Sequence, residues 1–199
     1  METITSLATE KLPNVDFASI GLIHSDGEMQ TLAPSSVLIV KADAVQYELN
    51  EGPCVDAVRS GVTMRTPHVG SDERWPSYGP QAASLGIAGQ MAVHLYATRS
   101  SNAALNLYSA TVGAFDESTH IAELFASHAA VALGFSRSVA TLKEALETRD
   151  AIGMAVGMTM ERYGLDEERA FSFLVRVSQT SNTKMRLVAK EIISQAAQQ

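Results

Sequence analysis

The chain has little of several features that would narrow its function at once. It has one cysteine, Cys54, in 199 residues, which excludes an intramolecular disulfide and a multi-thiolate metal site. It has no apolar run of membrane-spanning length, and its first ten residues show no basic stretch followed by an apolar core. These absences predict a cytoplasmic protein in a reducing compartment, without membrane association.

Motifs of catalysis and cofactor binding are also absent. The five histidines lack the spacing of a metal-binding helix, and there is no Gly-rich phosphate loop, nucleophile elbow or pair of catalytic carboxylates. We therefore expect no enzyme, and no catalytic residue, metal or cofactor. Cys54 follows Pro53 at an expected helix start, where a thiol could act as a redox sensor. The ordinary alternative is a small, buried and unreactive side chain.

Acidic residues outnumber basic ones, and the balance changes along the chain. The formal net charge is −7, from 15 basic and 22 acidic residues, which over the whole chain argues against nucleic-acid binding. Residues 142–199, however, hold eight of each sign, and from Arg169 onward five basic residues stand against one acid, Glu191. Because local charge decides where a phosphate backbone can dock, the C-terminal part stays a candidate for such binding.

The first two thirds of the chain alternate between strand-like and helix-like segments. Five segments have the composition of strands, at residues 17–24, 29–32, 62–66, 87–98 and 103–109. Helices are expected over 42–49 and 54–60. The segment from Pro67 to Pro80 is rich in Pro, Gly, Ser and charge, and it reads as a long surface loop. The mixture predicts an α+β domain on an antiparallel sheet.

From Glu117 onward, seven apolar residues and one histidine recur at alternating spacings of four and three. The repeat consists of Ile121, Phe125, His128, Ala132, Phe135, Val139, Leu142 and Leu146. A heptad seam of nearly four heptads predicts a long, coiled-coil-like linking helix. Its later part is expected to pair with a second chain in a parallel homodimer. The alternative is a helix that packs only on its own sheet.

Three helical segments are expected around and after Arg149. The first continues to Tyr163, the second covers about 166–179 with Asp166 as its N-cap, and the third covers about 184–195. The second and third each carry an apolar stripe at helical spacing. Such stripes must pack against each other and against the first helix, which predicts a small three-helix unit.

The residues of both parts match known families. The first part, roughly residues 15–136, resembles the GAF domains of actinobacterial regulators. The residues that carry this resemblance are 49–54 (Leu-Asn-Glu-Gly-Pro-Cys), 57–61, 74–76 (Arg-Trp-Pro) and 104–109. The second part, about 142–199, is similar to ANTAR domains. The residues that carry this resemblance are 149–157, 160–164, 170–171, 174–176, 178, 181–184 and 188–189.

The resemblance implies a division of the chain and a function. A GAF-like sensor domain would occupy 1–136, a helical linker 137–148, and a three-helix ANTAR-like RNA-binding domain 149–199. The protein would be a signal-responsive transcription antitermination regulator that stabilises RNA hairpins in leader transcripts. The GAF-like domain would sense an unknown signal, through a small-molecule ligand held between its sheet and the Pro67–Pro80 segment, and would control dimerisation.

Six basic side chains are the candidate RNA-binding residues. They are Arg149, Arg169, Arg176, Lys184, Arg186 and Lys190. Arg169 and Arg176 lie two helical turns apart and share a face, as do Arg186 and Lys190 one turn apart. Each pair could follow an RNA backbone. The alternative for such a stripe is a solvated helix face with ion pairs.

One position departs from the ANTAR pattern. The family usually has Lys between the Ala and the Gly of the first helix, and here Val156 stands there. A valine cannot contact phosphate, so an alternative function is a ligand-sensing or protein-interaction module that has lost RNA binding. A helix-turn-helix DNA binder is a further alternative. Gly153 and Gly157 each cost about 1 kcal/mol inside a helix, which predicts close approach of another helix or of RNA.

Overall fold

The computed structural model describes residues 1–196, and it separates into two compact units, Met1–Gly134 and Phe135–Gln199. The domain boundaries expected from the sequence, after residues 136 and 148, stay a prediction. Residues 197–199 of the expected ANTAR-like domain lie outside the described residues.

The first unit is built on a five-stranded antiparallel sheet with strand order β2-β1-β5-β4-β3. The strands are β1 Phe17–His24, β2 Met29–Leu32, β3 Met64–Thr66, β4 Gly89–Ala97 and β5 Ser101–Ser109. β1 pairs with β5 along its whole length, from Phe17 opposite Tyr108 to His24 opposite Ser101. The predicted α+β class with an antiparallel sheet is confirmed.

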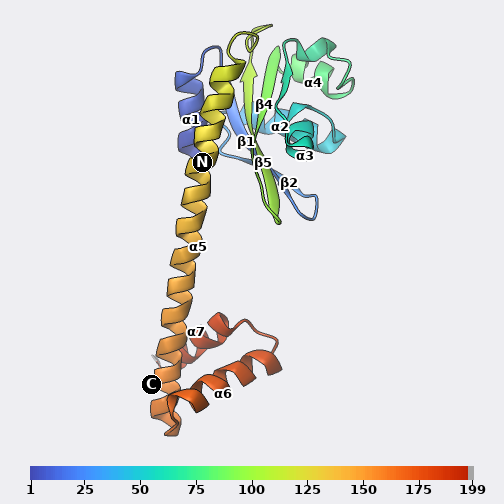
Figure 1. The fold of residues 1–199 in the computed structure, drawn as a ribbon. Coiled ribbons are helices and arrows are strands. Elements are labelled where there is room, and N and C mark those ends of the chain that lie inside the picture. The colour runs from blue at the N-terminus through green and yellow to red at the C-terminus, as the bar shows by residue number, and fades with distance from the viewer. Residues whose placement is uncertain (197–199) are drawn as a thin grey trace. The chain divides into compact units, whose positions relative to one another are not determined.

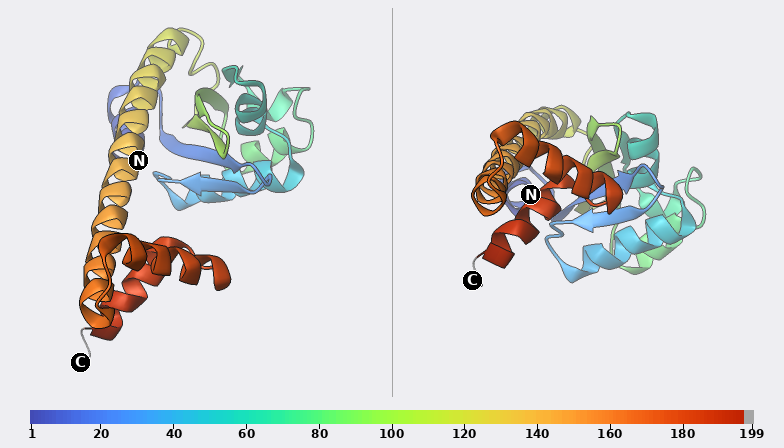
Figure 2. Two further views of the ribbon diagram at one scale, coloured as in Figure 1. Left: turned by 60° about the horizontal axis from the view of Figure 1, so that its bottom comes forward. Right: turned by 90° about the horizontal axis from the view of Figure 1, so that it is seen from below.

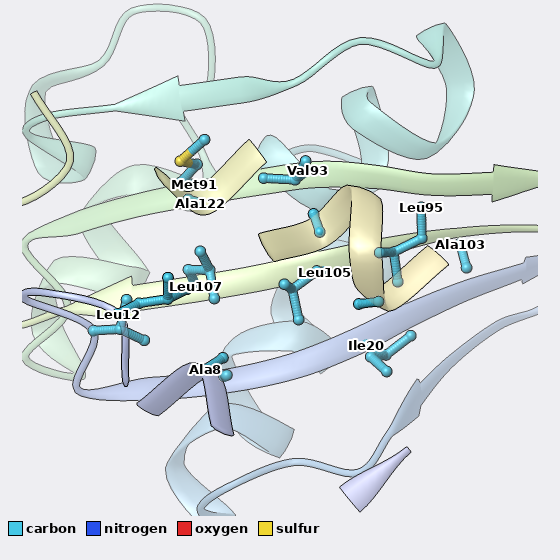
Figure 3. Close-up of a cluster of buried hydrophobic side chains, with 14 of the residues drawn as sticks. Ala8, Leu12, Ile20, Met91, Val93, Leu95, Ala103, Leu105, Leu107 and Ala122 are labelled. Atoms are coloured by element: carbon cyan, nitrogen blue, oxygen red, sulfur yellow. The ribbon is translucent and has the colours of Figure 1, made fainter. Parts of the chain in front are cut away.

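Helices cover both faces of this sheet (Figure 1). α1 (Glu2–Lys11) and the N-terminal part of α5 (Thr119–Tyr163) lie on one face. α2 (Val37–Leu49), α3 (Pro53–Ser60) and α4 (Tyr78–Ser84) lie on the other. Between the sheet and the first pair of helices is an apolar core to which each element contributes small or branched side chains, among them Ala8, Ile20, Leu105 and Ala122 (Figure 3).

The residues of α5 that pack on the sheet form a stripe different from the predicted seam. Ala122, Ala126, Ala129 and Leu133 recur at spacings of four, three and four, and all four are buried. Ile121 and Phe135 of the predicted seam are 52% and 74% exposed. The small alanine side chains let the helix approach the sheet closely. Of the larger apolar seam residues, Phe125 packs partly against this core, whereas Val139, Leu142 and Leu146 are more than half exposed.

The Pro67–Pro80 segment is not the surface loop that its composition predicts. It contains a 3-10 helix at Val69–Ser71 and the start of α4, and Val69, Trp75 and Tyr78 are buried. A Cβ on Gly79 would lie 2.3 Å from the carbonyl oxygen of Val69. The absence of a side chain at Gly79 permits close packing of α4 on the 3-10 helix. Glycine in this segment therefore indicates tight packing rather than a mobile loop.

Two other helices differ from the prediction. α2 begins at Val37, five residues before the expected start at 42, because the Ser36 hydroxyl accepts a hydrogen bond from the Leu38 amide and caps the helix. α1 was not predicted. It buries Ala8 against β1 and thereby extends the first unit to the N-terminal residues described.

The described residues of the second unit form three helices, as predicted. They are the C-terminal part of α5, α6 (Glu167–Thr180) and α7 (Met185–Ala196), drawn in orange and red in Figure 2. Gly164, in the left-handed region at φ 62°, ends α5, and the Asp166 carboxylate accepts a hydrogen bond from the Arg169 amide at 2.8 Å to start α6. None of the described helices is long and apolar enough to cross a membrane.

Candidate functional site

Arg169 and Arg176 of α6 lie together at the surface of the second unit. Both are exposed, and with Ser172 and Phe173 they line a hollow of about 530 Å³. The Arg169 guanidinium lies 3.4 Å from the Asp166 carboxylate, but both side chains are more than half exposed, so this ion pair restrains Arg169 weakly. The shared face predicted for the two arginines is therefore present and accessible.

Arg186 of α7 is already engaged. Its Nη1 donates to Oε1 of Glu144 in α5 at 2.9 Å, with the side chains 41% and 66% exposed. Glu144 lines a hollow of about 550 Å³ together with Arg149 of α5 and Phe171 of α6. A phosphate group that binds Arg186 must therefore compete with the Glu144 carboxylate.

Lys184 and Lys190 are both exposed, one just before α7 and the other one turn after Arg186. Four of the six candidate residues fall into two groups by the hollow that they line or adjoin, and Lys184 and Lys190 line neither hollow. Arg169 and Arg176 share one hollow of α6, whereas Arg149 and the Arg186–Glu144 pair adjoin another hollow between α5 and α6. Both hollows include aromatic side chains of α6, Phe173 in the first and Phe171 in the second.

Val156 is part of the helical core. Its side chain is 6% exposed and packs in a cluster with Ala155, Ala170, Leu174 and Ala189, so it cannot contact phosphate. Gly153 and Gly157 are different, because a Cβ on either would meet no atom within 4 Å. Within the part of the chain that the structure describes, the close approach expected at these glycines does not occur. Both glycines instead line a hollow of about 710 Å³.

A buried polar network lies in the first unit, where the sheet meets α2 and α3. Its centre is Asp43, which is fully buried and, among the described residues, accepts its hydrogen bonds from uncharged donors. The donors are Ser19 at 2.8 Å, Thr31 at 2.9 Å, Gln46 at 3.3 Å, Asn106 at 3.5 Å and the Tyr108 hydroxyl. Burial raises the pKa of the Asp43 carboxyl to about 6, and the hydrogen bonds from Tyr108, Ser19, Thr31 and Gln46 oppose this rise.

Cys54 lies at the edge of this network. The Asn106 amide nitrogen is 3.1 Å from its Sγ, and a Cβ on Gly21 would lie 2.3 Å from the same sulfur atom, so the thiol is tightly enclosed. Burial, followed by the charge of Asp43, raises the pKa of the Cys54 thiol. A neutral, enclosed thiol favours the unreactive alternative over the redox sensor.

The space expected to hold a ligand is filled by side chains in this structure. Between the sheet and the Pro67–Pro80 segment lie the fully buried rings of Trp75, Tyr78 and Tyr108. The Trp75 indole N–H donates to the Asp56 carboxylate at 2.8 Å, and the Arg74 guanidinium stacks 4.2 Å from the centre of the ring. A ligand that enters here must displace one of these rings.

Two groups of residues with a candidate functional role were not predicted from the sequence. The first is the Asp43 network, for which polar residues such as Ser19 and Asn106 inside otherwise apolar strands were the available signal. The second is an exposed aromatic pair in the second unit, Tyr163 with Phe173. The adjacent Arg162 and Tyr163 at the end of a helix were a weak signal for it, since only the fold brings Phe173 alongside.

Two family models match the chain. One, described as a GAF domain, matches residues 1–134, and the other, described as an ANTAR domain, matches residues 140–193. A comparison with curated proteins found no match.

Several solved structures share the fold of the first part. The GAF domain region of a protein from Geobacter sulfurreducens has 17% identity and a TM-score of 0.55, covering 68% of this chain and 91% of that chain. A GAF domain/HD domain protein from the same organism has 13% identity and a TM-score of 0.50, with 68% and 91% covered. A type II free methionine-R-sulfoxide reductase from Thermoplasma acidophilum has 19% identity and a TM-score of 0.52, with 65% and 86% covered. At these identities the similarity concerns the fold alone.

Proposed function

Because the chain belongs to the GAF domain family and an ANTAR domain follows its GAF domain, as in antitermination regulators, we propose that it is a signal-responsive RNA-binding regulator of transcription antitermination. GAF domains are associated with signal sensing and ANTAR domains with RNA binding, and both are regulatory rather than catalytic domains. The partner is a hairpin of a leader transcript in the cytoplasm.

The observation that carries this proposal is the ANTAR match over a three-helix unit whose candidate basic residues lie at its surface. Five of them are exposed, and Arg186 is partly exposed. The RNA-binding residues in this proposal are Arg149, Arg169, Arg176, Lys184, Arg186 and Lys190. Their contacts are to phosphate and ribose, which hold a hairpin without reading its sequence.

The acting form in this proposal is a parallel homodimer through α5. Phe135, Val139, Leu142 and Leu146 occupy successive seam positions, and each is more than half exposed. Large apolar side chains in a continuous stripe are costly in water, and pairing with the same stripe of a second chain would bury them. A dimer also presents two ANTAR domains to two hairpins of one transcript.

The signal in this proposal enters through the GAF domain, which contains the buried polar network around Asp43. A small molecule would reach this region only if Trp75 or Tyr78 moved, which would couple binding to the packing of α4. Trp75 is the single tryptophan, so its fluorescence reports such a change directly.

Titration of the full chain against tandem-hairpin leader RNAs tests the RNA-binding function. We expect the protein to prefer hairpins over a scrambled RNA of equal length, with affinity falling steeply as salt increases, because phosphate contacts release counterions. The double variant Arg169→Ala with Arg176→Ala should weaken binding and flatten the salt dependence while the fold is retained.

Equal affinity for hairpin and scrambled RNA would mean that the ANTAR fold has been kept without its activity. The chain would then be an interaction or ligand-sensing module. Preference for duplex DNA over both RNAs would indicate a helix-turn-helix function of α6 and α7 instead.

A further inference from the structure

Two aromatic rings meet at the surface of the second unit without being buried there. Tyr163 at the end of α5 is 58% exposed and Phe173 in α6 is 41% exposed. Their ring centres are 5.8 Å apart at an interplanar angle of 43°. The Arg162 guanidinium lies 6.0 Å from the centre of the Tyr163 ring, on the same side of the unit. Exposed aromatic rings beside a guanidinium group are the usual partners of unpaired bases.

The two rings border a cleft that a base could enter. The cleft has a volume of about 590 Å³ and lies between the C-terminal end of α5, the middle of α6 and α7. Val188 and Ile192 of α7 contribute apolar lining. A volume in this range is typical of sites for small organic molecules, which occupy roughly 300–1,000 Å³. The cleft therefore has room for a planar base stacked on either ring.

The polar groups of the cleft suit the edge of a base. Glu191 and Gln195 of α7 line it, and the Gln195 amide nitrogen donates to the Glu191 carboxylate at 3.4 Å. At this length the hydrogen bond is weak, so the carboxylate can accept a hydrogen bond from a base amino group instead. A base with an exocyclic amino group matches this arrangement.

The cleft also adjoins the basic stripe of α6. Phe173 lies four residues after Arg169 and three before Arg176, so the three side chains share one face of the helix. Phe173 lines both the hollow of the two arginines and the aromatic cleft. A phosphate held by Arg169 or Arg176 would thus place a neighbouring base close to the Phe173 ring.

We propose that Tyr163 and Phe173 form a stacking site for an unpaired base in the loop of a bound RNA hairpin, next to phosphate contacts by Arg169 and Arg176. The inference rests on the proposed RNA-binding function and adds to it a contact that distinguishes a looped hairpin from a continuous duplex. The Arg162 guanidinium adds a cation above the Tyr163 ring, where it can also interact with the bound RNA strand.

The test compares two RNAs that differ only in their loop bases. One is a tandem-hairpin leader RNA, and the other is the same RNA with abasic loop residues, which keeps every phosphate. We expect the full-length protein to bind the intact loops about tenfold more tightly, in line with the value of one stacked base. Phe173→Leu and Tyr163→Leu should each reduce this preference several-fold and leave the salt dependence unchanged.

Phe171→Leu is the matched control. Phe171 lies on the same helix and is 45% exposed, but it lines the hollows near Arg149 rather than the aromatic cleft. It should keep the full loop preference. Thermal unfolding of all three variants verifies that the second unit remains folded.

The outcomes separate the two proposals. Salt-dependent hairpin binding that is indifferent to the loop bases, or to Tyr163 and Phe173, would overturn the stacking site and leave the RNA-binding function intact. An absence of hairpin preference in the parent protein would overturn both. A change in molar mass of the Tyr163→Leu or Phe173→Leu protein, with loop preference unchanged, would assign the rings to contact between copies of the chain and reject the stacking site.

Discussion

Among single residues, Val156 is the departure from the ANTAR pattern, and it lies in the core of the second unit. Its side chain packs between α5, α6 and α7 and is 6% exposed. The hollow lined by Gly153 and Gly157 adjoins it, and Glu167 and Glu168 line the same hollow. A longer side chain at 156 would have to leave the core and extend into that space. A substitution at position 156 is therefore expected to change the packing of the second unit first, and RNA binding only as a consequence.

We expect Val156→Lys, which introduces the residue usual in the family, to lower the free energy of unfolding by about 1–2 kcal/mol, because the valine contacts are lost while the amine reaches the hollow. There it would meet the carboxylates of Glu167 and Glu168 rather than phosphate. Urea unfolding measures the cost, with Val156→Met as the uncharged control of similar length. A Lys variant as stable as the parent that binds hairpin RNA more tightly would show that position 156 faces the RNA.

Asp43 makes the stability of the first unit depend on pH. Its pKa is raised from 3.8 to about 6 in the folded protein, so the folded state binds the proton more tightly than the unfolded state. The stabilisation is present when the carboxyl is protonated and is lost as pH rises through about 6. Ionised Asp43 at pH 7 thus costs on the order of 3 kcal/mol.

Unfolding of the first unit can be followed by Trp75 fluorescence. As pH falls from 7 to 5, protonation of Asp43 should therefore raise the free energy of unfolding. Asp43→Asn should remove this contribution, whereas Glu48→Gln, an exposed carboxyl on the same helix, should retain it. Asp72, whose pKa is held at about 2 by the Arg74 guanidinium, loses its contribution only at lower pH. Identical pH profiles for Asp43→Asn and the parent would contradict this assignment.

Among the helices, α5 and α7 are joined by the ion pair between Glu144 and Arg186. Glu144 lies on α5 between the exposed seam residues Leu142 and Leu146, and Arg186 is one of the candidate RNA contacts. The pair thus links the helix expected to dimerise with the helix expected to bind RNA. Its side chains are substantially exposed, so its own contribution to stability is small, roughly 0–1 kcal/mol.

Glu144→Gln should strengthen hairpin binding about two- to fivefold, since Arg186 loses its competing carboxylate and one more phosphate contact forms. The control is Glu147→Gln, which removes the same charge from an exposed position of α5 one turn away. Titration at two salt concentrations measures both variants. An equal gain for both would attribute the effect to net charge alone and would count against competition at Arg186.

On the scale of the whole molecule, α5 is the element that belongs to both units. Its small residues, such as Ala122 and Ala126, pack on the sheet of the GAF domain, whereas Ala155 and Val156 pack in the three-helix domain. Within each unit the seam positions from Ile121 to Leu146 are left largely exposed. One set of α5 side chains thus packs in the two cores, and another set, which we propose pairs with a second chain, is exposed.

Replacing Leu142 and Leu146 together by Glu should convert a homodimer into monomers, because like charges would face each other in the seam. Light scattering at micromolar concentration measures the molar mass. Val62→Glu with Val112→Glu is the control, since both valines are 58% exposed in the GAF domain and lie off the helix. A monomeric parent protein, or a control pair that also dissociates, would exclude α5 as the dimer interface.

Local signals in the sequence determined much of this architecture. Signals that act within a few residues mark where helices and strands begin and end, so these elements were predictable. Examples are the Asp166 cap, the Gly27 turn, and Gly61 and Gly164 in the left-handed region. The heptad repeat likewise predicted a long helix. The resemblance to GAF and ANTAR domains, read from short ordered motifs, is confirmed by the family matches.

Contacts between distant residues decided the rest. Only the tertiary structure shows which stripe of α5 meets the sheet, since alanines and larger apolar residues are equally compatible with helical spacing. Only packing buries Val69, Trp75 and Tyr78 of the largely exposed Pro67–Pro80 segment and gathers five donors from several elements around Asp43. The same is true of Glu144 with Arg186 and Tyr163 with Phe173. Composition and periodicity describe each segment by itself, whereas these pairs exist because folding brings separate segments together.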